Sequence, residues 1–464
     1  MFWSSIGDRT IFENIKQVKR GHYLVVSEKK MKQIQYWEEP LLNNEIKKFK
    51  SYNEAKNFLF SSLESSVKMQ CHGEVGYASY LSGGIDSSAL SYILKKLNPD
   101  KKLKTFSITF DNKEYDESSA QKEAERFLGL NHTSINIKNQ DISSNFRKVI
   151  NHSETLLFRT APVPLYLLSK KVNEIGQKVV FTGEGADEIL LGYDLFAENR
   201  IRRFWNKNPG SNIRPKLLTK LYNYLPQFKN SRYFSILKDF YSNSLSDTSN
   251  LFYSHLVRWQ QFQQVSSFFN FGMSEKELEE NILNEFISQL PTDFNKTSSD
   301  RKAQILEFET LLSGYLLSSQ GDRMTMANSV EGRYPFLSQK FVKDVSKISD
   351  NLKTMGIRSK SLFRDAMNKK VPNSITKRPK IAYQAPEAKC FLDSNFISDE
   401  AIFLNDTSKD IDIINNKNLL SLNKKITNNY SSDRLGFREN MAYIMCMSAA
   451  QLSDVSKKWN DKKI

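Results

Sequence analysis

A short segment near residue 85 combines glycines, hydroxyls and one acid in a way that suits phosphate binding. Glycine lets the backbone approach an anion closely, and serine hydroxyls donate hydrogen bonds to its oxygens. Asp86 would repel a phosphate, and its presence is explained if Mg²⁺ lies between the two groups. A Walker A loop, by contrast, needs a Gly-Lys pair that this segment lacks. The sequence predicts a phosphate-binding loop rather than an ordinary Gly-Gly turn, made by Leu81, Ser82, Gly83, Gly84, Asp86, Ser87 and Ser88.

A second glycine-rich segment carries acids that could hold a metal or a proton. It begins at Thr182 and Gly183, and a further glycine separates Glu184 from Asp187. One carboxylate of such a pair can bind Mg²⁺ while the other orients or deprotonates an attacking amine. The alternative is a helix start at which the helix dipole favours acidic residues. Together with the first segment, the pattern favours a catalytic site.

Two later segments and one arginine supply further charged groups. Residues 322–337 read DRMTMANSVEGRYPFL, in which we expect Glu331 and Arg333 to form an ion pair beneath the site. Residues 377–386 read KRPKIAYQAP, where the Lys380 ammonium could stabilise charge that develops on a departing phosphate group. Arg159 could hold a phosphate or a substrate carboxylate.

The segments that must position these residues alternate between strand and helix. We expect strands at 75–81, 103–110, 133–137 and 178–182, and helices at 52–69, 87–97, 118–128, 142–152 and 164–175. This alternation predicts an α/β fold with a doubly wound, mostly parallel sheet, in which ligands bind at the carboxyl ends of the strands. Both glycine-rich segments directly follow an expected strand, so they should meet at that edge.

Three parts are expected along the chain. Residues 1–45 read as a short β-rich part, with a strand at 22–26 and a partner at 32–37, too small to enclose a core. Residues 46–390 hold the sheet and a large helical part that includes residues 195–317. Residues 391–464 hold a loosely ordered polar excursion, rich in Asn, Ser, Lys and Asp between 393 and 434, and then a packed helix at 437–452.

Composition limits the class of protein. The 464 residues carry a net charge of +15, but no dense basic block marks a nucleic-acid surface. The three cysteines show no CxxC spacing, so neither a zinc site nor a disulfide framework is indicated. No apolar run approaches the roughly 20 residues that a membrane span requires. We therefore expect a cytoplasmic protein without a membrane or nucleic-acid partner.

The four segments resemble known motifs. Ser82-Gly83-Gly84-Ile85-Asp86-Ser87-Ser88 resembles the signature of the ATP pyrophosphatase superfamily, whose members cleave ATP to AMP and pyrophosphate, and the other segments resemble motifs of its asparagine synthetase branch. The resemblance implies an adenine nucleotide alpha hydrolase-like fold, with ATP as substrate and Mg²⁺ as cofactor. It implies that Asp86 and Asp187 bind Mg²⁺, that Thr182 and Gly183 contact the nucleotide, and that Glu184 and Lys380 are catalytic. Residue 338 departs from the family pattern, because it is serine where aspartate is usual.

The start of the chain also differs from the family pattern. Glutamine-hydrolysing members begin with a glutaminase domain that uses an N-terminal cysteine, whereas here Phe2 follows Met1 and residues 1–45 resemble only the end of that domain. The resemblance thus implies a synthetase part that lacks most of the glutaminase domain. Nitrogen would come from free ammonia or from a separate glutaminase subunit docked on residues 1–45, unless the chain is a truncated product. Exposed strand edges there favour a partner or self-association as a homo-oligomer.

The function that the resemblance implies is ATP-dependent amide formation. A carboxylate, expected to be the β-carboxyl of aspartate, is adenylated, and ammonia or an amine then displaces AMP. The same chemistry could serve another carboxylate, as in β-lactam synthetases, lasso-peptide cyclases and surface-sugar amidotransferases. Two different classes of protein fit less well: an RNA-modifying enzyme of the same superfamily and a catalytically idle scaffold. The Glu184 and Lys380 motifs argue against the RNA-modifying enzyme, and the intact set of charged site residues argues against the scaffold.

Overall fold

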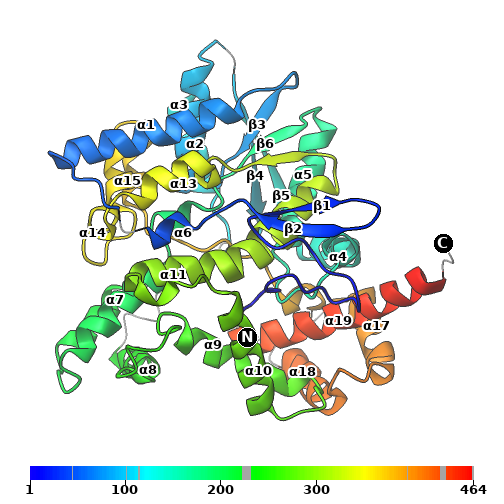
Figure 1. The fold of residues 1–464 in the computed structure, drawn as a ribbon. Helices are drawn as coiled ribbons and strands as arrows, with labels where there is room; N and C mark the ends of the chain where they lie inside the picture. Colours follow the sequence, from blue (N-terminus) through cyan, green and yellow to red (C-terminus); the bar gives the residue numbers. More distant parts are fainter. Residues whose placement is uncertain are drawn as a thin grey trace.

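A five-stranded sheet lies at the centre of the computed structural model, which describes residues 1–43, 45–100, 102–112, 115–221, 231–393, 396–428 and 435–461. The strand order is β5-β4-β3-β6-β7, and every neighbouring pair is parallel (Figure 1). The strands are β3 (Tyr77–Tyr80), β4 (Lys104–Phe110), β5 (Asn131–Ile137), β6 (Val179–Phe181) and β7 (Glu331–Arg333). The α/β fold class expected from the sequence is confirmed.

Helices cover both faces of this sheet. Side chains alternate along a strand, so Val179 and Val180 of β6 face opposite sides. Val179 belongs to the apolar cluster that includes buried residues of α1 (Tyr52–Gln70) and α2 (Ile85–Leu97), whereas Val180 packs in a cluster with α5 (Pro162–Glu174). Burial on both faces explains why β6 reads as a continuous apolar run.

The elements expected around the sheet are all present, with ends displaced by a few residues. The helix expected at 142–152 begins earlier, at Asn139, and the strand expected at 75–81 is shorter, as β3. The fifth strand, β7, was not expected. It contains three residues and forms its ladder with β6 alone, so it carries too little alternation to be recognised from the sequence.

The remaining chain is mostly helical, as expected for residues 195–317. The other α-helices described before residue 390 are α3 (Ser118–Leu128), α4 (Asn139–Ser153), α6 (Ala186–Ile189), α7 (Asp194–Asn206), α8 (Ser231–Ser242), α9 (Leu256–Gln263), α10 (Glu275–Gln289), α11 (Ser299–Glu307), α12 (Arg323–Met326), α13 (Gln339–Ser346), α14 (Asp350–Lys353), α15 (Ser361–Ala366) and α16 (Asn373–Lys377). Between α11 and α12 the chain forms a π-helix, η6 (Phe308–Asp322). Wide helical turns of this kind are frequently found at functional sites.

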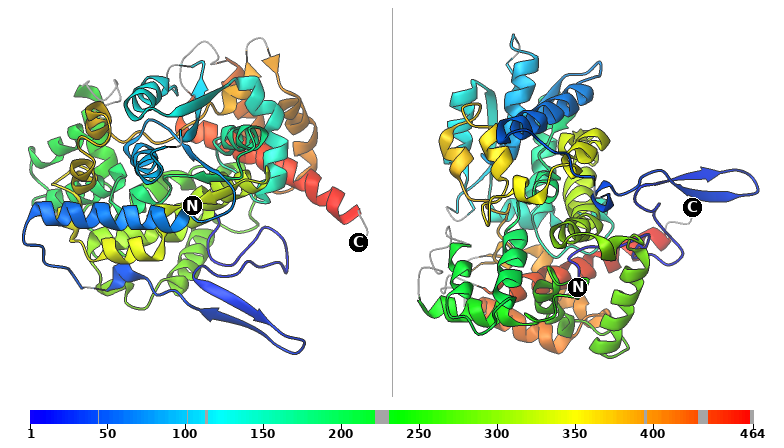
Figure 2. Two further views of the ribbon diagram at one scale, coloured as in Figure 1. Left: turned by 90° about the horizontal axis from the view of Figure 1, so that it is seen from above. Right: turned by 60° about the vertical axis from the view of Figure 1, so that its left-hand side comes forward.

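An antiparallel hairpin precedes the sheet, as expected. Strand β1 (His22–Val26) pairs with β2 (Met31–Gln35), with His22 opposite Gln35. The hairpin projects from the body of the molecule (Figure 2, right). Several of its large apolar side chains are exposed, including Leu24, Val25, Val26 and Met31. This arrangement leaves an apolar surface and strand edges open to contact.

The expectation of a loosely ordered excursion at 393–434 is wrong for most of its length. Residues 394–395 and 429–434 lie outside the described residues, but α17 (Asp399–Thr407) and α18 (Asn416–Asn428) occupy most of the rest. Leu404 and Leu422 of these helices are buried in one cluster with Phe146 of α4 and with α19 (Phe437–Asp461). The polar composition of this segment suggested loose order because each of the two helices buries only one narrow apolar stripe and exposes polar residues on its other sides. The same cluster spans the expected boundary at residue 390.

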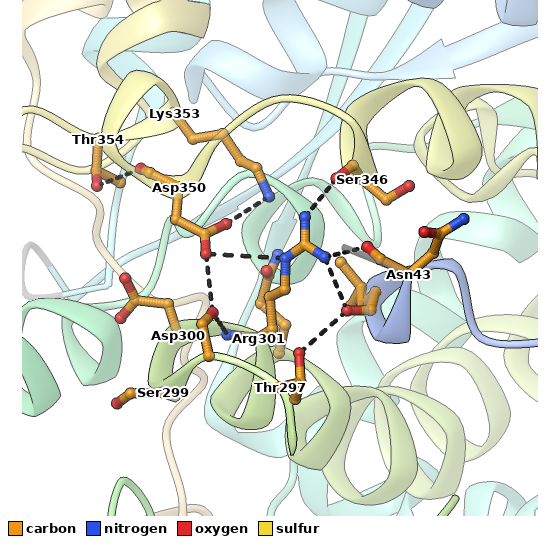
Figure 3. Close-up of polar contacts among 12 residues, drawn as sticks. Asn43, Thr297, Ser299, Asp300, Arg301, Ser346, Asp350, Lys353 and Thr354 are labelled. Atoms are coloured by element: carbon orange, nitrogen blue, oxygen red, sulfur yellow. Dashed lines mark hydrogen bonds and ion pairs between the residues drawn. The ribbon is translucent and has the colours of Figure 1, made fainter. Parts of the chain in front are cut away.

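A buried arginine joins the segment after the hairpin to the body of the protein (Figure 3). Arg301 of α11 donates to the carbonyl oxygens of Leu41 (3.1 Å), Asn43 and Ser346 (2.6 Å), and its guanidinium lies 3.9 Å from the Asp350 carboxylate. Asp350 also pairs with the buried ammonium of Lys353 at 3.0 Å. The group fastens residues 41–43 to α11 and to the ends of α13 and α14. Among the described helices, none has the length and apolar character that crossing a membrane would need.

Candidate active site

The first glycine-rich segment forms a tight turn from β3 into α2. Gly83 has φ +77°, and a side chain there would collide with Ala120 of α3. The Ser82 amide donates to the Ser87 hydroxyl (3.1 Å), and the two hydroxyls lie 3.0 Å apart. Gly84 caps α2 without a side-chain hydrogen bond, so the first amides of this helix face a position where an anion would bind favourably.

The second segment lies directly against the first. The α-carbon of Gly183 approaches Asp86 so closely that an added Cβ would stand 3.1 Å from the Asp86 Cβ. Gly185 has φ +86°, and a side chain there would collide with Leu337. The Thr182 hydroxyl donates to the Glu184 carboxylate at 3.3 Å. The structure thus brings both segments together at the carboxyl ends of β3 and β6, as expected from the sequence.

Two lysines and two aspartates form a charged cluster between these segments. The Lys360 ammonium donates to both carboxylate oxygens of Asp86, at 2.8 and 2.7 Å, and lies 2.6 Å from Oδ1 of Asp187. The Lys380 ammonium lies 2.8 Å from Oδ2 of Asp187. The Lys360 side chain is only 2% exposed, and the two carboxylates are the partners that offset the cost of burying its ammonium group.

Sequence reasoning missed Lys360. It precedes α15 in a loop far from both glycine-rich segments in the sequence, and its backbone is left-handed, with φ +51°. Left-handed backbone at a residue other than glycine is uncommon and often marks a functional position. The only sequence signal is a lysine placed directly before an apolar helix, which is too common a pattern to single out one residue.

The cluster changes the proton affinities of its members. Burial alone would raise the pKa of the Asp187 carboxyl, but Lys360 and Lys380 together lower it to about 2. Burial would lower the pKa of the Lys380 ammonium, but Asp187 and Asp86 raise it above its usual value. For Glu184, burial raises the pKa and Lys380 only partly opposes the increase. Glu184 is therefore a stronger base than an ordinary glutamate, whereas Asp187 stays ionised.

The donor chemistry of this cluster fits the Mg²⁺ that the sequence predicts. Carboxylates of Asp86 and Asp187 approach one cation, Lys360, and hard oxygen ligands of this kind suit Mg²⁺. Within the described residues no group of three or more His, Cys, Asp or Glu could enclose a metal. A two-carboxylate site matches the usual protein share of a Mg²⁺ shell, whose other ligands are waters and substrate phosphates.

A cavity of about 280 Å³ connects these groups. Of the expected site residues, its lining includes Leu81, Ser82, Asp86, Ser87, Thr182, Gly183, Glu184, Asp187 and Lys380. Gly83, Gly84 and Ser88 lie outside this lining, and Ser88 is fully buried. The structure therefore gathers the charged and hydroxyl groups of the prediction around one space, and the remaining three residues shape the loop behind it.

Other residues that the sequence analysis singled out form ion pairs or cap a helix. Arg159 lines the cavity but pairs with Glu387 at 3.2 Å. Arg333 pairs with Glu331 at 2.8 Å, although the Glu331 side chain is 58% exposed, so this pair does not lie beneath the site. At the position where the family usually has aspartate, the Ser338 hydroxyl caps α13 by accepting from the Phe341 amide.

A buried acid next to the cluster was also missed. Glu188 of α6 is 1% exposed and accepts a hydrogen bond from the Tyr193 hydroxyl at 2.8 Å. Burial raises its pKa to about 8, and the nearby Asp187 and Glu307 add to the increase. A glutamate with this pKa is mostly protonated at neutral pH, so it adds no full negative charge beside Asp187.

Comparison with known proteins agrees with this geometry. Residues 59–441 match the asparagine synthase family. The chain is 28% identical to the glutamine-hydrolysing asparagine synthetase 1 of Bacillus subtilis, over 70% of this chain and 49% of that protein. It is 27% identical to amidase chyE of Penicillium rubens, over 82% of this chain and 60% of that protein. The chain thus spans about half the length of the first relative and somewhat more of the second. Since the family match covers most of its residues, the chain belongs to the asparagine synthase family.

Proposed function

We propose that this protein is an ATP-dependent, AMP-forming carbon–nitrogen ligase that converts a carboxylate into an amide. The observation that carries the proposal is one cavity lined by the Ser82 loop, by Glu184 and by Asp86, Asp187 and Lys380 of the lysine–aspartate cluster. Phosphate binding, charge stabilisation and proton transfer can therefore occur around one bound substrate. Membership of the family and the names of its relatives, asparagine synthetases and amidases, support amide chemistry.

In the first step the substrate carboxylate is adenylated. The ATP phosphates bind the Ser82 loop and the amides that begin α2. A carboxylate oxygen forms a bond to the α-phosphorus while the bond to pyrophosphate breaks. Lys360 and Lys380 turn from the carboxylates toward pyrophosphate and stabilise its developing charge. Mg²⁺ bound by Asp86 and Asp187 would supply further positive charge to the same oxygens.

In the second step an amine displaces AMP. The nitrogen lone pair forms a bond to the acyl carbon, and the acyl–oxygen bond to AMP breaks. Glu184 lines the cavity, and the Thr182 hydroxyl holds its carboxylate. Because burial raises the pKa of Glu184, this carboxylate can accept the proton that the attacking nitrogen loses.

The substrate and the nitrogen source follow from less direct observations. Aspartate is the carboxylate implied by the asparagine synthetases, whereas the name of the amidase relatives specifies no carboxylate. Nitrogen comes from ammonia or from a separate glutaminase subunit. The exposed apolar side chains of the hairpin, such as Val25 and Val26, support a partner at that surface, either such a subunit or a second copy of the chain.

The proposal is tested by removing one carboxylate of the cluster without changing its size. Asp86→Asn should lower AMP formation from Mg-ATP, carboxylate and ammonium by at least about 100-fold, because the buried lysine and the metal both lose a partner. Asp100→Asn, at an exposed position, is the matched control and should keep the wild-type rate. AMP is measured by chromatography. A wild-type rate in folded Asp86→Asn would contradict the proposal.

A further inference from the structure

Several aromatic side chains form one wall of the cavity that Glu184 also lines. Its rings come from distant segments: Phe158 and Tyr315 lie 4.5 Å apart between ring centroids, and Trp3 and Phe158 lie 6.3 Å apart. Tyr383 completes this wall. It lines the same cavity as Tyr315 and Glu184, and its hydroxyl donates to the Ala161 carbonyl oxygen at 3.5 Å. A flat apolar group could pack here with its carboxylate directed toward Glu184.

Backbone features hold this wall in place. Trp3 has φ +60°, an uncommon backbone conformation for a residue other than glycine. A side chain at Gly314 of η6 would collide with the Ser5 carbonyl oxygen, so glycine is needed for the segment of Trp3 to pack against η6. Tyr315 follows this glycine in η6. The positions of Trp3 and Tyr315 in the cavity wall therefore both depend on the close contact between Gly314 and the Ser5 backbone.

Two polar atoms in this wall have no partner within the described residues. The Trp3 indole nitrogen and the Tyr315 hydroxyl are both buried without a hydrogen bond, and Tyr315 is only 4% exposed. A buried polar group without a hydrogen bond lowers the stability of the folded protein. Both can donate a hydrogen bond. A ligand that offers an acceptor oxygen or nitrogen at this position would relieve that cost.

One cation of the lining is less available. Arg159 lines the cavity but pairs with Glu387 at 3.2 Å. Arg159 also lies over the ring of Phe437, with 4.8 Å between its central carbon and the ring centroid. A substrate with a second carboxylate, such as the α-carboxylate of aspartate, would have to break the Arg159–Glu387 pair to bind this guanidinium, whereas a substrate with one carboxylate would not.

We infer that this site amidates an aromatic monocarboxylate that carries a hydrogen-bond acceptor on its ring. The ring packs between Phe158 and Tyr383, and the acceptor binds Tyr315 and Trp3. This inference rests on the proposed function, and the reaction is the one given there: the carboxylate oxygen bonds to the α-phosphorus as pyrophosphate leaves, and nitrogen then replaces AMP. The aromatic wall would act in specificity rather than in chemistry.

The test compares two classes of acid in one assay of AMP release, with Mg-ATP and ammonium. One class is benzoate with its 2-, 3- and 4-acetyl derivatives, and the other is aspartate and succinate. We expect at least one acetylbenzoate to exceed both aspartate and benzoate about tenfold in kcat/KM, the gain of one buried hydrogen bond. A preference for aspartate would overturn the inference and leave the proposed function intact. Absence of acid-dependent AMP release with every acid would overturn both.

Two substitutions locate the contact. Tyr315→Phe removes only the hydroxyl, and should raise the KM of the preferred acetylbenzoate about tenfold while leaving benzoate within about twofold. Trp3→Phe should have the same selective effect. Tyr166→Phe, a tyrosine outside the cavity lining, is the matched control. Equal effects of Tyr315→Phe on both acids would contradict the inference. Thermal shifts with the acids and a non-hydrolysable ATP analogue report binding independently of turnover.

Discussion

Gly192 lies directly against the Lys360 side chain, which leaves no room for a side chain at residue 192. A Cβ added at Gly192 would overlap Cε of Lys360 and Oδ1 of Asp187. The Gly192 amide also donates to the Asp187 carbonyl oxygen at 2.7 Å. The absence of a side chain at residue 192 therefore gives the buried lysine its path to both aspartates.

Gly192→Ala should disturb the cluster without removing any charge. The added methyl group displaces Lys360 or Asp187, and we expect the free energy of unfolding to fall by about 1–3 kcal/mol and AMP formation to fall at least tenfold. Gly210→Ala is the matched control, because no atom lies closer than 3.9 Å to its added Cβ. Urea denaturation and AMP release measure the two effects. If the Gly192→Ala protein is as active and as stable as the wild type, the close contact of residue 192 with Lys360 and Asp187 is not needed.

Lys360→Met should lose most catalysis because pyrophosphate loses a buried cation. We expect AMP formation to fall at least about 100-fold. The substitution also leaves Asp86 without its buried partner, which lowers stability, so Lys360→Arg is made in parallel to keep the charge while changing its geometry. The exposed Lys122→Met serves as control. AMP release at the wild-type rate by folded Lys360→Met would rule out the role.

Glu184→Gln should separate the two chemical steps. The amide keeps the shape of the side chain but cannot accept a proton, so adenylation should continue while amide formation slows at least tenfold. Pyrophosphate exchange into ATP, with the preferred acid, measures the first step, and mass spectrometry of the amide measures the second. If both steps slow equally, Glu184 acts in substrate binding and not as the base.

Glu188 should make stability depend on pH. Its pKa is about 8 in the folded protein, against 4.5 for an ordinary glutamate, so the folded state holds more protons between these values. The free energy of unfolding must then fall as the pH rises from about 5 to 8. Glu188→Gln should remove this contribution to the pH dependence of the free energy of unfolding. Urea denaturation at several pH values checks it, and identical slopes in both proteins would contradict the assignment.

Arg301→Met should release the segment that follows the hairpin. It removes the donors that hold the carbonyl oxygens of Leu41 and Ser346 and leaves those oxygens and Asp350 without this partner. We expect a loss of about 3–5 kcal/mol in stability and faster proteolysis near residue 43. Arg301→Lys keeps the charge but loses the several N–H donors of the guanidinium. Its stability should lie between those of the wild type and Arg301→Met. Unchanged cleavage in Arg301→Met would show that other contacts hold the segment.

The sequence was most informative where chemistry and backbone geometry coincide within a few residues. The Ser82 turn and the turn at Glu184 each need glycines, hydroxyls and acids at fixed spacing after a strand, so both could be found without a structure. Lys360 could not, because it reaches Asp86 from 274 residues away and its own neighbours carry no recognisable pattern. Trp3 escaped for the same reason, since its place in the cavity depends on a distant helix.

The helices and strands divide in the same way into those that the sequence predicted and those that it did not. Long amphipathic helices such as α1 and α3 and the apolar strands of the sheet were recognisable from their periodicity. Strand β7 was too short for any pattern, and α17 and α18 were hidden by polar composition. The roles assigned to the site residues remain predictions that the substitutions above can decide.

The lysine–aspartate cluster is electrically balanced before any nucleotide arrives. Asp86 and Asp187 carry two negative charges, and Lys360 and Lys380 carry two positive charges. A divalent cation alone would meet two ammonium groups, and a nucleotide alone would meet two carboxylates, so each ligand should bind weakly by itself. Bound together, the cation can pair with the two carboxylates while the nucleotide phosphates pair with the two ammonium groups. Nucleotide and cation should therefore strengthen each other's affinity by equal factors, as thermodynamic linkage requires.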